Sequence, residues 1–129
     1  MILVTGGTAQ GKRAFVEREL TAGEAVEWVD GAQADMDRLL SAAFCYNFQA
    51  FVRRALTGEV EADTGGLAQI LLQARPDRVI VTDEIGGGIV PVDRLERSWR
   101  EETGRLCCSL AAGARQVWRV NCGLGQRIK

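Results

Sequence analysis

The sequence predicts an α/β protein in which helices flank a mostly parallel sheet. Short, continuously apolar runs occur at residues 1–5, 78–82 and 117–121, as in strands that are covered on both faces. Helix-forming segments separate these runs, and such alternation is typical of a parallel sheet. The first run also ends in glycines and leads directly into a helical segment, a junction that fits the same class of fold.

The first third of the chain is expected to alternate strand and helix closely. After the strand at 1–5, residues 12–20 should form a helix that closes near Gly23. Residues 25–29 (AVEWV) then predict a second strand, and 30–35 are polar and turn-like.

The segment 36–56 has two interpretations. Apolar side chains recur at helical spacing from Met36 to Leu56 with only Asn47 polar among them, which predicts one long helix. A central break with a short strand around 42–45 is the alternative, and periodicity does not decide between them.

The second half is expected to begin with a loop, a helix and a strand, at 57–66, 67–74 and 78–82. A Gly-rich loop then runs to Pro91. Asp93 is a good N-cap, with Glu96 in capping-box position, for a helix that extends to about Ala112. The buried stripe of this helix is expected to be Leu95, Trp99, Leu106 and Leu110.

Length and charge limit the classes of protein. The chain has 129 residues, the length of one domain, and 16 basic and 17 acidic residues leave a net charge of −1. This balance gives no footprint for nucleic acid or an anionic membrane. No apolar run approaches the roughly 18 residues of a membrane span, and the chain starts with a strand rather than a signal peptide. We therefore expect a cytoplasmic protein with no nucleic-acid partner and no membrane span.

Histidine and cysteine usage excludes several kinds of site. These 129 residues contain no histidine, so a histidine general base, nucleophile or metal ligand is absent from them. The four cysteines have the spacing of neither a zinc site nor a disulfide framework. Each is expected to be a buried structural thiol: Cys45, Cys107, Cys108 and Cys122.

Residues 3–13, LVTGGTAQGKR, fit the phosphate-binding pattern G-x-x-x-x-G-K-[ST] except at its last position. In such a loop, backbone N–H groups cradle the phosphates and the lysine reaches the β- and γ-phosphates. The cofactor is therefore expected to be ATP or GTP with Mg²⁺, and 1–129 a single P-loop nucleotide-binding domain. The candidate nucleotide-binding residues are Gly6, Gly7, Thr8, Ala9, Gln10, Gly11, Lys12 and Arg13, with Lys12 also a catalytic candidate. A Gly-rich turn with a solvated lysine is the alternative.

Arg13 replaces the hydroxyl that normally binds magnesium. A guanidinium has no lone pair for a metal, so two outcomes are open. Arg13 either points to solvent while Mg²⁺ is held elsewhere, or its charge replaces that of the metal. Thr5 and Thr8 are candidates for the missing hydroxyl because they are close in sequence.

Asp83 and Glu84 end the strand at 78–82, where ligands of open α/β sheets bind. Either carboxylate could hold Mg²⁺ or accept the proton of a substrate hydroxyl, so both are candidate metal-binding and catalytic residues. Two solvated acids in a turn are the alternative.

A basic face is predicted on the helix that Asp93 opens. It comprises Arg94, Arg97, Arg100 and Arg105, of which Arg97 and Arg100 are spaced to clamp a phosphate. The alternative is a solvated face paired with Glu96, Glu101 and Glu102.

Three stretches together resemble one family: ILVTGGTAQGK, VIVTDEIGGGIVPVDRLERSWREETGR and VNCGLGQRIK. The middle stretch is similar to the pattern N-E-[VI]-G-x-G-I-V-P followed by R-x-x-R-[DE]-x-x-G-R. This pattern is typical of the adenosylcobinamide kinase/adenosylcobinamide-phosphate guanylyltransferase family of cobalamin biosynthesis. The close resemblance covers a little over a third of the chain, whereas 24–76 matches poorly and looks shortened.

The resemblance implies a RecA-like P-loop fold, often trimeric, and two activities. One phosphorylates the aminopropanol hydroxyl of adenosylcobinamide with ATP or GTP. The other transfers GMP from GTP to that phosphate through a guanylylated histidine. The expected partner is adenosylcobinamide or a related corrinoid, with a homo-oligomer possible. The resemblance makes Gly86, Gly88, Pro91, Arg97 and Arg100 the candidate substrate-binding residues.

Departures from the family pattern change the expected function. No histidine is present, Asp83 replaces an Asn, Cys107 stands where an Asn is usual, and Arg13 replaces a Ser or Thr. We therefore expect a corrinoid kinase without guanylyltransferase activity. The alternatives are a non-catalytic module that binds nucleotide or corrinoid, and a P-loop protein with another class of substrate.

Overall fold

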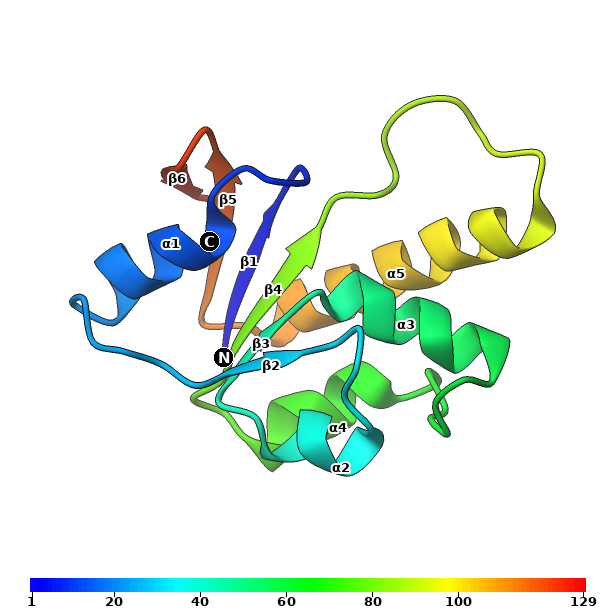
Figure 1. The fold of residues 1–129 in the computed structure, drawn as a ribbon, viewed down its shortest axis with the longest axis horizontal. Coiled ribbons are helices and arrows are strands. Elements are labelled where there is room, and N and C mark those ends of the chain that lie inside the picture. Colours follow the sequence, from blue (N-terminus) through cyan, green and yellow to red (C-terminus); the bar gives the residue numbers. More distant parts are fainter.

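A six-stranded sheet forms the centre of the computed structural model, which describes all residues 1–129 (Figure 1). The strand order is β2-β3-β4-β1-β5-β6, with β1 to β5 parallel and β6 antiparallel to β5. The strands are β1 Ile2–Gly6, β2 Trp28–Asp30, β3 Phe44–Tyr46, β4 Val79–Asp83, β5 Gln116–Asn121 and β6 Leu124–Arg127.

Helices cover both faces of the sheet (Figure 1). They are α1 Lys12–Phe15, which continues as the π-helical turn η1 Val16–Leu20, α2 Met36–Ser41, α3 Phe48–Thr57, α4 Leu67–Ala74 and α5 Arg94–Gly113. Alternate residues of β1 enter two separate cores: Leu3 packs with α2 to α5, and Val4 packs with Phe15 and Val16. The strand is apolar throughout because both of its faces are buried. None of these helices is long and apolar enough to cross a membrane.

The long helix predicted for 36–56 is wrong, and the interrupted alternative is confirmed. Ala42 takes an extended conformation after α2, and Asn47 a left-handed one (φ 53°) before α3. Between them β3 pairs with both β2 and β4. Helical spacing of apolar residues could not reveal this break, because the ladders that stabilise β3 come from distant segments.

Other elements agree with the sequence in kind and differ at their ends. The strands predicted at 1–5, 78–82 and 117–121 and the helix at 67–74 are confirmed within one residue or so. The strand predicted at 25–29 is shorter and later, at Trp28–Asp30. Strand β6 was not predicted. It follows a two-residue turn in which Cys122 (φ 52°) and Gly123 (φ 76°) both have positive φ, as a type I′ hairpin requires.

The cysteines only partly follow the prediction of buried thiols. Cys45 is buried in β3, and burial raises the pKa of its thiol to about 12. Cys107 is half-buried. The prediction is wrong for Cys108, on the outer face of α5, and for Cys122, in the hairpin turn, because both are exposed.

Candidate active site

The loop between β1 and α1 has the backbone that a phosphate cradle requires. Gly6 has φ 154°, and a Cβ there would lie 2.3 Å from the Val120 carbonyl oxygen of β5. Gly11 has φ 83° at the position that precedes α1. A side chain at Gly6 would therefore displace β5 or the loop, which explains why glycine is needed there.

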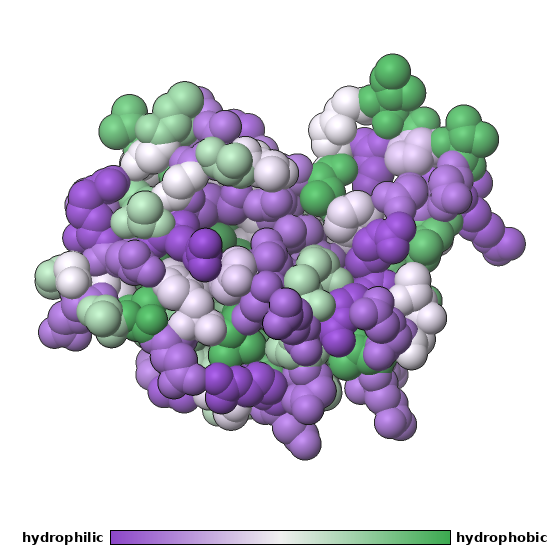
Figure 2. All heavy atoms as spheres, viewed as in Figure 1, coloured by the Kyte–Doolittle hydropathy of each residue, from purple (hydrophilic) through white to green (hydrophobic).

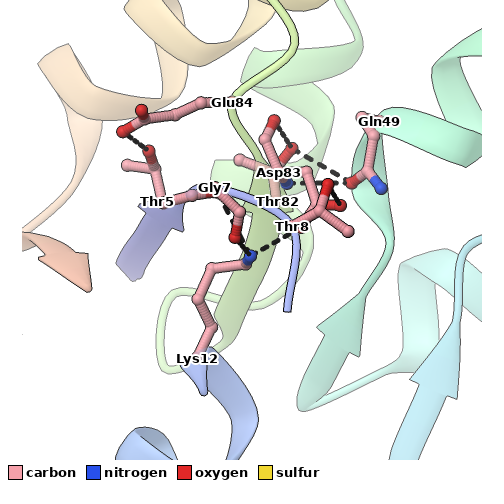
Figure 3. Close-up of polar contacts among 9 residues, drawn as sticks. Thr5, Gly7, Thr8, Lys12, Gln49, Thr82, Asp83 and Glu84 are labelled. Carbon is pink, nitrogen blue, oxygen red and sulfur yellow. Dashed lines mark hydrogen bonds and ion pairs between the residues drawn. The ribbon is translucent and has the colours of Figure 1, made fainter. Parts of the chain in front are cut away.

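Lys12 is the first residue of α1, and its buried side chain reaches back to the start of the loop (Figure 3). Its Nζ donates to the carbonyl oxygens of Gly6 (3.2 Å) and Gly7 (2.6 Å) and lies 2.6 Å from Asp83 Oδ1. The ion pair links the phosphate loop to the carboxyl end of β4. Two residues that are far apart in the sequence, both predicted for the site, therefore meet.

Asp83 is held on three sides (Figure 3). The Thr8 hydroxyl donates to Asp83 Oδ2 (3.1 Å), while the Asp83 backbone N–H donates to Gln49 Oε1 (3.0 Å). The buried Gln49 also accepts from the Thr82 hydroxyl (3.4 Å). The carboxylate is thus fixed between Lys12 and Thr8. Gln49 belongs to α3, and its local sequence gives no sign that its side chain would bind the end of β4.

Glu84 faces a different set of partners from its neighbour. Its carboxylate accepts two hydrogen bonds from Arg119 of β5 (2.8 and 3.0 Å) and one from the Thr5 hydroxyl (3.0 Å). The hydrogen bonds from Arg119 lower the pKa of Glu84 below its ordinary value, against the opposing effect of burial. No cluster of three or more acidic or cysteine side chains forms a ready metal site. The predicted metal pair is thus divided, with Asp83 at the phosphate loop and Glu84 bound to Arg119.

A cavity of about 480 Å³ adjoins the loop. Its walls come from the loop, the start of α1 and the ends of β3 and β4: Thr8, Ala9, Gln10, Gly11, Lys12, Arg13, Ala14, Tyr46, Asn47, Val81 and Asp83. The cavity is therefore an open space next to the glycine loop, and Lys12 and Asp83 both line it.

Arg13 is exposed to solvent and also lines the edge of this cavity. Its guanidinium stands 4.2 Å from the centre of the Tyr46 ring, a cation–π contact. The Tyr46 hydroxyl donates to Asp30 Oδ2, and Asn47 Nδ2 donates to Asp30 Oδ1, both at 3.0 Å. The stack places a positive charge at the lining of the cavity and does not supply the missing hydroxyl.

The β5–β6 hairpin fastens the loop at Gln10. The Gly123 N–H donates to the Gln10 carbonyl oxygen and the Cys122 N–H to Gln10 Oε1, both at 2.8 Å. The positive φ values of the turn present these two N–H groups to the loop. These two hydrogen bonds to Gln10 were not predicted from the sequence, although Gly123 is a residue that favours a turn.

The candidate substrate-binding residues are only partly brought together. Arg100 donates to the carbonyl oxygens of Gly86 and Ile89 (the latter at 2.8 Å) and so braces the Gly-rich loop on α5. The other three candidates take no part in these hydrogen bonds and do not line the cavity next to the phosphate loop: Gly88, Pro91 and Arg97. The loop exposes Ile89, Val90 and Val92. Green, hydrophobic spheres gather at the upper right of Figure 2, where Figure 1 shows this loop.

The capping box predicted at the start of α5 forms only in part, and one of the predicted arginine–glutamate pairs on this helix is present. Asp93 caps the helix by accepting from the Glu96 N–H (3.0 Å). The Glu96 side chain does not complete the capping box, because it pairs with Arg53 of α3 (2.6 Å). Arg105 pairs with Glu102 and donates to the Thr64 carbonyl oxygen (3.0 Å), so it links α5 to the segment before α4.

Comparisons with known proteins identify the family of the chain. The model of the family described as "cobinamide kinase / cobinamide phosphate guanyltransferase" matches residues 39–128. The match includes 39–76, within the central segment whose resemblance was expected to be poor. Two curated relatives are both named "bifunctional adenosylcobalamin biosynthesis protein CobU".

The Escherichia coli (strain K12) relative is 38% identical over 76 residues, which is 59% of this chain and 42% of that protein. The Salmonella typhimurium (strain LT2) relative is 51% identical over 51 residues, 40% of this chain and 28% of that protein. The aligned segments thus span less than half of each relative. The family match nevertheless covers well over half of this chain, with the phosphate loop lying before it. With its P-loop α/β fold, the chain belongs to the cobinamide kinase / cobinamide phosphate guanyltransferase family.

Proposed function

We propose that this chain is a nucleotide-dependent kinase of cobalamin biosynthesis that phosphorylates the hydroxyl of adenosylcobinamide. The observation that carries the proposal is the Lys12–Asp83 pair inside the glycine loop. A phosphate-binding lysine and a carboxylate that can accept a hydroxyl proton lie within 2.6 Å of each other and line the same cavity. Family membership supplies the substrate class.

In the proposed reaction, the loop N–H groups and Lys12 hold the triphosphate of ATP or GTP. Asp83 takes the proton of the acceptor hydroxyl as its oxygen bonds to the γ-phosphorus, and the bond from that phosphorus to the bridging oxygen breaks. ADP or GDP leaves with the electron pair. Catalysis of this kind rests mainly on positioning and on neutralising phosphate charge, which Lys12 and the loop supply.

Mg²⁺ fits this site through two oxygen ligands. Thr8 and Asp83 place a hydroxyl and a carboxylate 3.1 Å apart, and Mg²⁺ commonly binds proteins through one or two such groups together with substrate phosphates. A bound Mg²⁺ would neutralise phosphate charge. Thr8 would thereby replace the hydroxyl that Arg13 lacks, while Arg13 on Tyr46 adds a second positive charge at the cavity edge.

The guanylyltransferase reaction is proposed to be absent from this chain, because its 129 residues contain no histidine for a covalent GMP intermediate. We further propose, from the resemblance, a single cytoplasmic domain that forms a homo-oligomer such as a trimer. A non-catalytic module that binds nucleotide or corrinoid remains the second candidate, because Arg13 stands at the magnesium position and Lys12 is engaged by Asp83.

One mass-spectrometric experiment separates these candidates. The protein is incubated with adenosylcobinamide, Mg²⁺ and ATP or GTP, with Lys12→Ala as the control, and the corrinoid is examined for the gain of one phosphate. A gain with the native chain and none with the variant is expected. Intact nucleotide binding without any gain would favour the non-catalytic module. A GMP adduct in the intact mass of the protein would contradict the loss of guanylyl transfer.

A further inference from the structure

The Arg13 side chain lies beside the phosphate loop and forms no hydrogen bond or ion pair with the protein. It follows Lys12 at the start of α1 and lines the cavity next to the loop. Its guanidinium lies over the face of the Tyr46 ring, 4.2 Å from the ring centre. Such a contact uses the flat face of the guanidinium, whereas its five N–H donors lie in the plane and point outward. These donors are therefore available to a ligand in the cavity.

The Tyr46 ring that carries Arg13 is itself fixed by the neighbouring strand. Strands β2 and β3 lie side by side at one edge of the sheet, and their parallel register pairs Asp30 with Tyr46, the last residue of each strand (Figure 1). The Tyr46 hydroxyl donates to Asp30 Oδ2 (3.0 Å). Trp28, also on β2, meets the Tyr46 ring nearly at right angles, with 6.0 Å between the ring centres. The ring therefore cannot turn without losing both contacts.

Asp30 anchors the hydroxyl end of this ring as an ionised carboxylate. It accepts three hydrogen bonds, from the Tyr46 hydroxyl (3.0 Å), Asn47 Nδ2 (3.0 Å) and the Ala32 N–H (2.9 Å). Burial favours the neutral form of the carboxyl, but these hydrogen bonds and the charge of Arg13 outweigh burial and lower the pKa of Asp30 below its ordinary value. Asp30 forms no hydrogen bond with Arg13, so it attracts the guanidinium through space and leaves its N–H groups free.

The free donors of Arg13 suit an anion that carries several oxygen atoms. A guanidinium binds phosphate oxygens through charge-assisted hydrogen bonds, often two at a time. Arg13 and Lys12 line the same cavity, so a phosphate chain held by the loop comes within the surroundings of both side chains. The phosphates of a bound nucleotide are therefore the ligand whose chemistry fits these donors.

We propose that Tyr46 is a positioning residue that holds Arg13 ready to bind the phosphates of the nucleotide, with Asp30 and Trp28 fixing the ring. The inference rests on the nucleotide binding proposed above and not on the identity of the phosphate acceptor. Arg13 then contributes charge and hydrogen-bond donors at the position where the loop pattern has a serine or threonine. Tyr46 contributes by reducing the number of conformations that the long arginine side chain must lose when the phosphates bind.

The test is a double-mutant cycle on the binding of ATP and of tripolyphosphate, measured by calorimetry in EDTA so that no metal shares the phosphates. Arg13→Gln removes the charge, Tyr46→Leu removes the ring, and a third chain carries both changes. Tyr46→Phe keeps the ring and loses the hydroxyl. Arg115→Gln removes the same charge from an exposed arginine just before β5 and is the matched control. Melting temperature is recorded for each variant.

We expect Arg13→Gln and Tyr46→Leu each to weaken the binding of both ligands about tenfold, the lower end of what a charge-assisted hydrogen bond contributes, because Arg13 is exposed. The double variant should bind no more weakly than either single variant, because Tyr46 acts through Arg13. Tyr46→Phe should stay within about twofold of the native chain, since its ring still carries the guanidinium. Arg115→Gln should match the native chain.

Two losses that add up in the double variant would overturn the positioning role, because general damage to the fold acts whether or not Arg13 is present. A loss for ATP but not for tripolyphosphate in Tyr46→Leu would assign the ring to the nucleobase and overturn the role as well. Failure of the native chain to bind either ligand would overturn the phosphate loop and this inference together. Coupled losses without phosphoryl transfer to adenosylcobinamide would support this inference and contradict the kinase function alone.

Discussion

The Lys12–Asp83 pair predicts that Asp83→Asn binds nucleotide more tightly while losing phosphoryl transfer. Lys12 is 7% and Asp83 19% exposed, so solvent screens the pair only in part. A triphosphate that binds the loop must take Lys12 from this carboxylate and then lie near a second negative charge. The substitution keeps the shape of the side chain and removes that charge.

The magnitude follows from Coulomb's law. A unit phosphate charge about 8 Å from the carboxylate, at an effective dielectric constant of about 20, is repelled by about 2 kcal/mol. Removal of this repulsion should tighten binding about 30-fold when no divalent cation is present. The free protein should lose about 2 kcal/mol of stability, less than the 3–5 kcal/mol typical of a fully buried pair, because Asp83 is partly exposed and Lys12 keeps two carbonyl partners. Transfer should fall at least 100-fold, the usual contribution of a general base.

Calorimetric titration with ATP and GTP in EDTA measures the affinity, and thermal unfolding of the free protein measures the stability. Asp37→Asn, an exposed position on α2, makes the same change in net charge and serves as the control. If Asp83→Asn binds nucleotide no more tightly than the native chain in EDTA, Asp83 does not restrain Lys12 and the reasoning fails.

Three further predictions concern the same site. Lys12→Ala should weaken triphosphate binding by more than tenfold in calorimetry, and an unchanged affinity would rule out the phosphate loop. Arg13→Ser removes the positive charge that is stacked on Tyr46, so binding of the triphosphate should become more dependent on Mg²⁺. Equal titrations of the variant and the native chain, with and without Mg²⁺, would show that the Arg13 charge does not contribute to nucleotide binding. The hydrogen bonds from Arg119 lower the pKa of Glu84 in the folded protein below its ordinary value of 4.5. The ionised carboxylate therefore stabilises the fold above pH 4.5, and this stabilisation is lost as the pH falls through the lowered pKa of the folded state. Glu84→Gln should therefore be less stable than the native chain at pH 7 and approach it in melting temperature below about pH 4, and a constant difference across this range would refute the ion pair's role.

Much of the fold could be predicted from the sequence because its signals are local. A strand buried on both faces must be apolar throughout, which identified β1 and β4. Asp93 marked the start of α5 because its side chain satisfies a free N–H of the first helical turn. The break at β3 was left open, since its stability comes from pairing with β2 and β4 and not from its own residues.

By itself, the sequence determined the phosphate loop and the strand end that faces it. Glycine at residue 6 is needed by the backbone, Lys12 follows from the loop's spacing, and parallel strands bring their carboxyl ends to one edge of the sheet. Only the tertiary structure decided what each carboxylate does. The order β4-β1-β5 brings Asp83 to Lys12 and turns Glu84 toward Arg119. These contacts join residues that are far apart in the sequence, and the spacing of residues along the chain does not predict which strands become neighbours in the sheet.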